Sequence, residues 1–187
     1  LWNLNNCQTT NLPVQVFISP AAVAYFQQLG TPGYLNIWLD SSRDGDWEDA
    51  TLCGGQPAVE HITIDFPVNV AALGAGLHNI NVPTGLVPWQ NANQPAWVRI
   101  TLSERPSNKT LAAGALSYGD GRGYPQPFRT GETEDTIYRP AGADGAGPDM
   151  EVLRVVFLIV RNPAEWAGLG NVQPAISEKP ILRGGVI

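Results

Sequence analysis

The sequence lacks the features that mark a membrane-spanning or nucleic-acid-binding protein. It has no run of about 18 or more apolar residues, so no segment is long enough to cross a bilayer as a helix. Lys and Arg number 11 against 17 Asp and Glu, and the net charge of -6 makes nucleic acid or an anionic membrane surface a poor partner. The chain also starts at Leu1 with neither an initiator Met nor a signal-peptide pattern, so we expect a mature or excised piece of a longer protein.

Cysteine and histidine are scarce. No C-x-x-C or Cys/His zinc pattern occurs, and His61 and His78 have no partner at ligand spacing. Cys7 and Cys53 form one disulfide or remain two buried free thiols. The polar Gly-Gly turn after Cys53 favours the disulfide, which would stabilise the fold by about 4 kcal/mol in the chain-entropy model.

Long helical patterns are missing, whereas 20 Gly and 16 Pro are spread along the chain without a period. This distribution excludes a collagen-like repeat and predicts many turns between short strands. We therefore predict an all-β fold, an antiparallel β-sandwich of jelly-roll type with extended N- and C-terminal segments. The strands expected from apolar patterning are residues 14–18, 33–39, 61–66, 79–83, 95–103, 136–138 and 150–160.

Two of these segments alternate between apolar and polar residues, which indicates strands with one buried face. The side chains expected inward are Ile62, Ile64 and Phe66 in one strand, and Val98, Ile100 and Leu102 in the other. Residues 21–29 remain open between helix and strand, because Ala, Gln and Leu favour the helix and Val, Tyr and Phe the strand.

A length of 187 residues suffices for one well-formed core. Within it we distinguish an N-terminal segment with the first strands (1–29), a central β-sandwich (30–140) and a C-terminal part (141–187). That last part holds the most apolar strand and a Pro-containing tail. We expect it to belong to the same domain or to form a subunit contact.

Charge is concentrated in the stretch from Asp40 to Asp49, where five of the ten residues are carboxylates. A short acidic run with a glycine at a turn position, placed after an apolar strand, is typical of a calcium-binding loop. The expected ligands are side-chain oxygens of Asp40, Ser42 and Asp44, with Glu48 or Asp49, and a backbone carbonyl at Asp46. Thr51 stands where an EF-hand has its closing Glu, so the remaining ligands must come from elsewhere.

The run from Gly33 to Asp40, followed by Asp44-Gly-Asp-Trp-Glu-Asp49, resembles the first hallmark of the GEVED domain family. Gly131-Glu-Thr-Glu-Asp135 resembles the motif that names the family, and residues 98–103 are similar to the strand between them. The resemblance covers roughly residues 30–140. Ser42 replaces the usual Asn and still offers an oxygen, and Thr133 replaces Val.

Membership of this family implies a secreted or cell-surface bacterial β-sandwich module without an established enzymatic activity. We add the hypothesis that Glu132, Glu134 or Asp135 completes the calcium site of the acidic loop. In the alternative, residues 131–135 form a solvated turn whose carboxylates cap local amides.

The function expected from these features is a non-catalytic, calcium-stabilised extracellular module with a structural or adhesive role. Because terminal segments rich in Asn or Pro order only when something holds them, we consider strand addition between subunits, which would build a homopolymeric surface filament. Other surface proteins are further candidate partners. The alternative is a glycan- or substrate-binding accessory module of a secreted enzyme, reading its ligand through the loop 106–130 with Tyr118, Tyr124 and Phe128. No catalytic residues are expected, since no nucleophile lies near an evident base.

Overall fold

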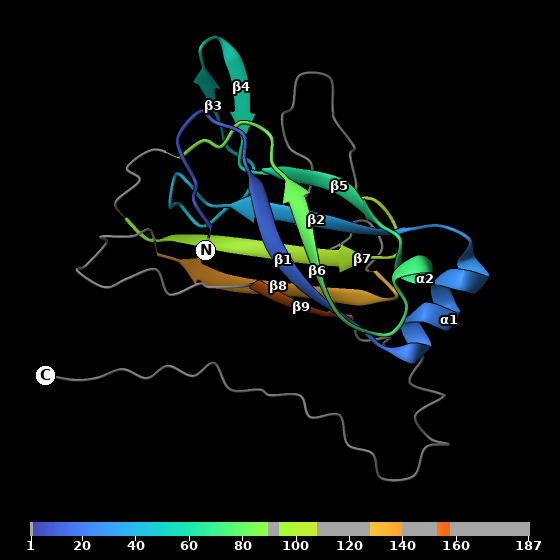
Figure 1. Ribbon diagram of the computed structural model, residues 1–187. Helices are drawn as coiled ribbons and strands as arrows, with labels where there is room; N and C mark the ends of the chain where they lie inside the picture. The colour runs from blue at the N-terminus through green and yellow to red at the C-terminus, as the bar shows by residue number, and fades with distance from the viewer. Residues whose placement is uncertain (1, 90–93, 108–127, 140–152, 158–187) are drawn as a thin grey trace, which may run out of the picture.

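The computed structural model describes residues 2–89, 94–107, 128–139 and 153–157, which are mainly strands in antiparallel sheets with few helices (Figure 1). The all-β expectation is therefore confirmed. The strands are β1 (Asn11–Ile18), β2 (Gly33–Leu39), β3 (Ala50–Cys53), β4 (Gln56–Val59), β5 (Thr63–Val68), β6 (Gly76–Pro83), β7 (Ala96–Ser103), β8 (Gly131–Tyr138) and β9 (Leu153–Phe157). The helices are α1 (Pro20–Leu29) and α2 (Val70–Leu73).

Three sheets contain these strands. One has the order β5-β2-β7-β8, a second the order β6-β1-β9, and β3 and β4 form a hairpin. All pairs are antiparallel except β1 with β9, which run parallel. Figure 1 shows β1 and β6 crossing over β2 and β7, with α1 and α2 together at one end.

Both larger sheets contribute to a single hydrophobic core. The predicted inward residues of β7 are confirmed, since Val98, Ile100 and Leu102 are fully buried in this cluster. The N-terminal segment belongs to the same core: Trp2 and Leu4 are buried, and the Tyr138 hydroxyl donates to the Trp2 carbonyl at 3.2 Å. Within the described part of the chain, the N-terminal segment thus packs on its own domain.

Residues 20–29 form a helix, which settles the open alternative for that segment. The Ser19 side chain accepts a hydrogen bond from the Ala22 N–H at 3.1 Å, Pro20 stands in the first turn, and Gly30 ends the helix in the left-handed region. These are strong start and stop signals. Capping and the burial of Ala22 and Phe26 on one face outweigh the strand preference of the β-branched and aromatic residues.

Strand β5 departs from the predicted alternation because it contains a bulge. Leu35 pairs with Phe66 but Ile37 pairs with Thr63, so β5 has one residue more than β2 over this stretch. Asp65 takes a positive φ of 48°, and its N–H bonds to the Asn36 side chain at 2.7 Å. Consequently Ile62 and Phe66 contact the core while Ile64 does not, and the prediction of one shared face is wrong.

Cys7 and Cys53 form a disulfide, as the sequence favoured. It ties the N-terminal segment to the β3–β4 hairpin, which we did not predict because its strands are only four residues long. Gly54 and Gly55, both at positive φ, form the two-residue turn of this hairpin.

The family-like motif of residues 131–135 is neither a turn nor a loop but the first half of β8. Gly131 starts the strand at φ 110°, and an added Cβ would overlap the backbone carbonyl of Leu102 on β7. The glycine is therefore required by close backbone approach as well as by its conformation.

We predict that Gly131→Ala destabilises the protein by about 3 kcal/mol or more, because strain and backbone displacement add up. Gly54→Ala is the matched control: it has a positive φ but open space around the new Cβ, so about 1 to 2 kcal/mol is expected. Urea unfolding of both variants measures this difference. Equal losses in the free energy of unfolding for Gly131→Ala and Gly54→Ala would show that the close approach to Leu102 does not matter for stability.

Candidate cation-binding loop

The acidic loop begins where β2 ends, and its first carboxylate is buried inside it. Asp40 is only 1% exposed, and its backbone N–H donates to the Trp97 carbonyl at 2.9 Å. Its carboxylate accepts hydrogen bonds from the Arg43 N–H at 2.6 Å and the Ser42 hydroxyl at 3.4 Å. Asp40 thus organises the turn rather than offering its carboxylate to solvent.

Glu60 holds the loop from the opposite side. One oxygen, Oε1, accepts hydrogen bonds from the Ser41 N–H at 2.7 Å, the Ser41 hydroxyl at 3.1 Å and the Ser42 N–H at 3.0 Å. The Glu60 backbone joins both ends of the loop. Its carbonyl accepts a hydrogen bond from the Leu39 N–H at 2.8 Å, and its N–H donates to the backbone carbonyl of Asp49 at 3.0 Å. One residue therefore fixes the start and the end of the loop.

Glu60 is fully buried, and within the described part of the chain its second oxygen, Oε2, has no hydrogen-bond partner. Burial raises the pKa of this carboxyl, and the negative charge of Asp40 raises it further, against the three hydrogen bonds that lower it. The charged form of Glu60 is therefore costly in the folded state.

Three exposed carboxylates of the loop lie together. Oxygens of Asp44, Asp46 and Asp49 are all within 4.8 Å of one another. Local turns hold them, since the Asp46 N–H donates to Asp44 at 3.1 Å and the Glu48 N–H donates to Asp46 at 2.9 Å. The first of these bonds, followed by one from the Ser42 hydroxyl, lowers the pKa of Asp44. Oxygens that share a calcium ion at about 2.4 Å lie up to about 5 Å apart, so the spacing fits this cation.

The predicted ligands are thus only partly brought together. Asp44, Asp46 and Asp49 form the group, with the Asp46 side chain in place of the expected backbone carbonyl, whereas the carboxylates of Asp40 and Glu48 do not join it. The Ser42 hydroxyl bonds to both Asp40 and Asp44. The carboxylates of β8 do not join it either. Successive residues of a strand point to opposite faces, so Glu132 and Glu134 lie on one side of β8 and Asp135 on the other. The hypothesis that Glu132, Glu134 or Asp135 completes the calcium site stays a prediction, since none of the three lies in the group.

Glu132 and Glu134 interact with each other instead. They stand opposite Leu102 and Ile100 of β7, on the side of the sheet that faces the core, and both are half-buried. Burial, the charge of Glu132 and a hydrogen bond with it raise the pKa of Glu134 to about 7. The two carboxyl groups therefore affect each other's titration, and neither lies in the group formed by the acidic loop.

Arg99 makes the connection between the loop and the motif of β8. Its guanidinium forms a bidentate ion pair with Asp135, at 2.6 and 2.7 Å, and lies over the ring of Trp47 at 4.8 Å from the centroid. Arginine is suited to both contacts, because its planar guanidinium forms two parallel hydrogen bonds with a carboxylate and also stacks on indole rings. The Arg99 side chain therefore links the acidic loop to the acidic motif of β8.

Sequence reasoning missed Glu60 and the pairing of Arg99. Glu60 lies 19 residues after Ser41 with no motif around it, so no local signal identified it. Arg99 alternates with the buried Val98 and Ile100 and pairs across the strands with Asp135. Reading the acidic motif as a strand, rather than as a loop or turn, could have identified this partner.

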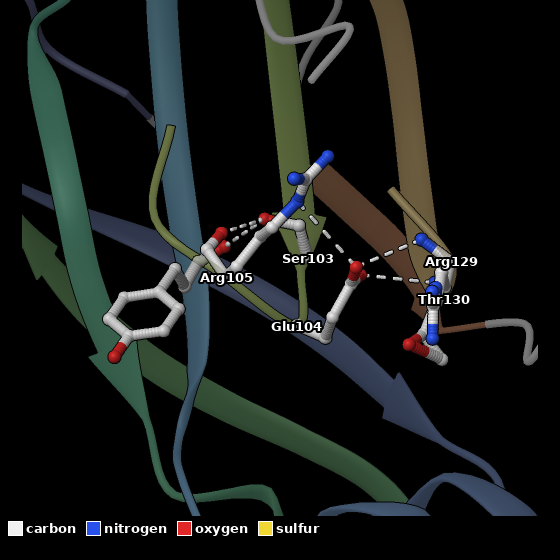
Figure 2. A network of polar contacts seen from close by, with 6 residues as sticks. Ser103, Glu104, Arg105, Arg129 and Thr130 are labelled. Carbon is white, nitrogen blue, oxygen red and sulfur yellow. Dashed lines mark hydrogen bonds and ion pairs between the residues drawn. The ribbon is translucent and has the colours of Figure 1, made fainter. Parts of the chain in front are cut away.

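The base of the loop 106–130 is fixed where the structure describes it. Figure 2 shows the Glu104 carboxylate directed at the backbone of Arg129 and Thr130, with hydrogen bonds of 2.9 and 3.1 Å. Phe128 is half-buried, and the Arg105 guanidinium lies over its ring at 5.1 Å. One face of this predicted ligand-binding aromatic is thus occupied. Tyr118 and Tyr124 lie outside the described residues.

Comparisons with models of protein families, with curated proteins and with solved structures return no match. Among the residues that the structure describes, no helix has the length and apolarity needed to cross a membrane.

We predict that Glu60→Gln stabilises the protein at alkaline pH and not at acidic pH. The pKa of Glu60 is raised in the folded protein above its unfolded value of about 4.5. The contribution of wild-type Glu60 to the free energy of unfolding is therefore fully present below the unfolded pKa and is lost as pH rises through the folded pKa. The amide keeps an accepting oxygen without the charge. Glu60→Ala, the contrasting variant, leaves the Ser41 and Ser42 donors unpaired and should cost about 2 kcal/mol or more at any pH.

Urea unfolding from pH 4 to pH 8 measures both effects. The free energy of unfolding of Glu60→Gln relative to wild type should increase steadily across this range. A constant difference would mean that Glu60 ionises normally in the folded protein.

Proposed function

We propose that this chain is a non-catalytic, calcium-stabilised extracellular module with a structural or adhesive role, in which the two larger sheets pack as a β-sandwich. The observation that carries the proposal is the group formed by Asp44, Asp46 and Asp49 on a loop that other contacts already hold in place. Three carboxylates within reach of one hard cation, and exposed to solvent, favour a site that fills where calcium is abundant.

The Cys7–Cys53 disulfide supports an extracellular location, since such bonds persist in oxidising compartments. The surface-filament prediction rests on strand addition by terminal segments. The N-terminal segment packs on its own core, and residues 158–187 lie outside the described part, so this prediction remains open to test.

In this role the bound cation further stabilises a loop that other contacts already hold in place. It binds the folded loop and not the unfolded chain, so it raises stability by mass action. The loop geometry is set by Glu60 and Asp40, and the ion relieves repulsion among carboxylates that these contacts bring together. Sites in extracellular modules commonly bind calcium with dissociation constants of about 10⁻⁴ to 10⁻³ M.

We predict that calcium binds in this range and raises the melting temperature, and that Asp46→Asn weakens binding by about tenfold or more because it removes one of three charged ligands. Glu132→Gln is the matched control, as it makes the same acid-to-amide change in β8, away from the group. Calorimetric titration measures the affinities.

Two results would contradict the proposal in different ways. Absence of calcium binding by the wild-type protein would show that the protein is not stabilised by calcium. An equal loss of affinity in Glu132→Gln would instead restore a site shared between the loop and β8.

A further inference from the structure

A pocket of 330 Å³ opens beside the acidic loop, between that loop and the neighbouring ends of β7 and β8. We call it the Trp97 pocket; the residues that shape it are Arg43, Asp44, Gly45, Pro95, Trp97 and Ile137. Its volume is at the lower end of the range of about 300 to 1,000 Å³ typical of sites for small ligands. One or two rings of a ligand would fill it.

One wall of the pocket is an exposed aromatic ring. Trp97 is 48% exposed because the alternation that buries Val98 turns its neighbour outward. It pairs across the strands with Ile137, so indole and isoleucine form a continuous apolar surface at the outer end of the sheet. An indole ring beside a hollow is suited to binding, since Trp offers a large apolar face and is enriched at interfaces.

The rest of the lining is largely polar and carries both signs of charge. Asp44 and the buried Asp40 contribute carboxylates to the lining. The Arg43 guanidinium is fixed by backbone carbonyls, donating to Pro95 at 2.9 Å, Ser41 at 3.1 Å and Gln94 at 3.1 Å. Gly45, at φ 91°, has open space where a side chain would stand. The Arg43 guanidinium in the lining is therefore held in place.

We propose that the Trp97 pocket binds a neutral pyranose sugar. A pyranose ring has one face rich in C–H bonds, whose partial positive charge is attracted to the negative face of the indole. Its hydroxyl groups donate hydrogen bonds, which suits a lining that includes the Asp44 carboxylate. Because the lining holds the Arg43 guanidinium as well as the carboxylates of Asp40 and Asp44, a ligand with a single charge of either sign meets a like charge there. The contacts come from protein side chains, so binding does not require calcium.

The test uses the full chain labelled with 5-fluorotryptophan, in EDTA so that no cation contributes. Of the six Trp resonances, the one missing in Trp97→Phe identifies Trp97. Cello-, chito-, malto-, manno- and xylo-oligosaccharides are titrated to about 10 mM, a range that detects weak millimolar binding. We expect the Trp97 resonance to shift saturably with at least one of them, while the buried Trp2 resonance stays unchanged.

Variants assign the binding to this pocket. Trp97→Ala and Asp44→Asn should each weaken binding by about tenfold or more, measured by calorimetric titration because Trp97→Ala lacks the reporting resonance. Phe17→Ala, an exposed aromatic on the other sheet, and Glu48→Gln, a carboxylate of the same loop outside the pocket, should bind as wild type does. If Trp97→Ala fails to fold, Asp44→Asn decides.

The inference is overturned if no saccharide shifts the Trp97 resonance, or if folded Trp97→Ala or Asp44→Asn binds as wild type does. Such a result leaves the calcium proposal intact, because that one is measured by cation titration. Conversely, absence of calcium binding would not affect this pocket.

Discussion

The contact between the Glu60 carboxylate and the backbone of Ser41 and Ser42 is the interaction on which the candidate site depends. The Glu60 side chain is fully buried, and the Glu60 backbone joins Leu39 before the loop to Asp49 near its end. Such a buried carboxylate is expensive unless it is well bonded. Here one oxygen accepts three hydrogen bonds while the other is unsatisfied in the described part of the chain, so the contact specifies geometry at some cost in stability.

Two arginines balance the acidic groups around this contact. Arg43 reaches three backbone carbonyls, and Arg99 pairs with Asp135 while stacking on Trp47. The loop is therefore held by internal contacts, and a bound cation would add to an arrangement that already exists. The same contacts fix Arg43 and Asp44 beside Trp97, so the proposed cation group and the proposed sugar pocket depend on one preorganised loop.

The sequence predicted what periodicity and local motifs encode. The strand character of β2 and β7, the inward residues of β7 and the disulfide all followed from local patterns or from cysteine count. The bulge at Asp65 did not, because it depends on the Asn36 side chain in another strand. The role of Glu60 was hidden for the same reason. Likewise, we assigned the acidic motif of β8 to the calcium site from its composition. In the structure, strand alternation places its carboxylates on two faces, and Asp135 pairs with Arg99.

Amide hydrogen exchange of Ser41, Ser42 and Arg43 in calcium-free protein tests the central claim most directly. If Glu60 and Asp40 hold the loop, these three N–H groups are bonded without any ion, and their exchange should be slow in EDTA compared with that of the unfolded chain. Exchange as fast as in the unfolded chain in EDTA, becoming slow only when calcium is added, would show that the cation organises the loop and would contradict this account.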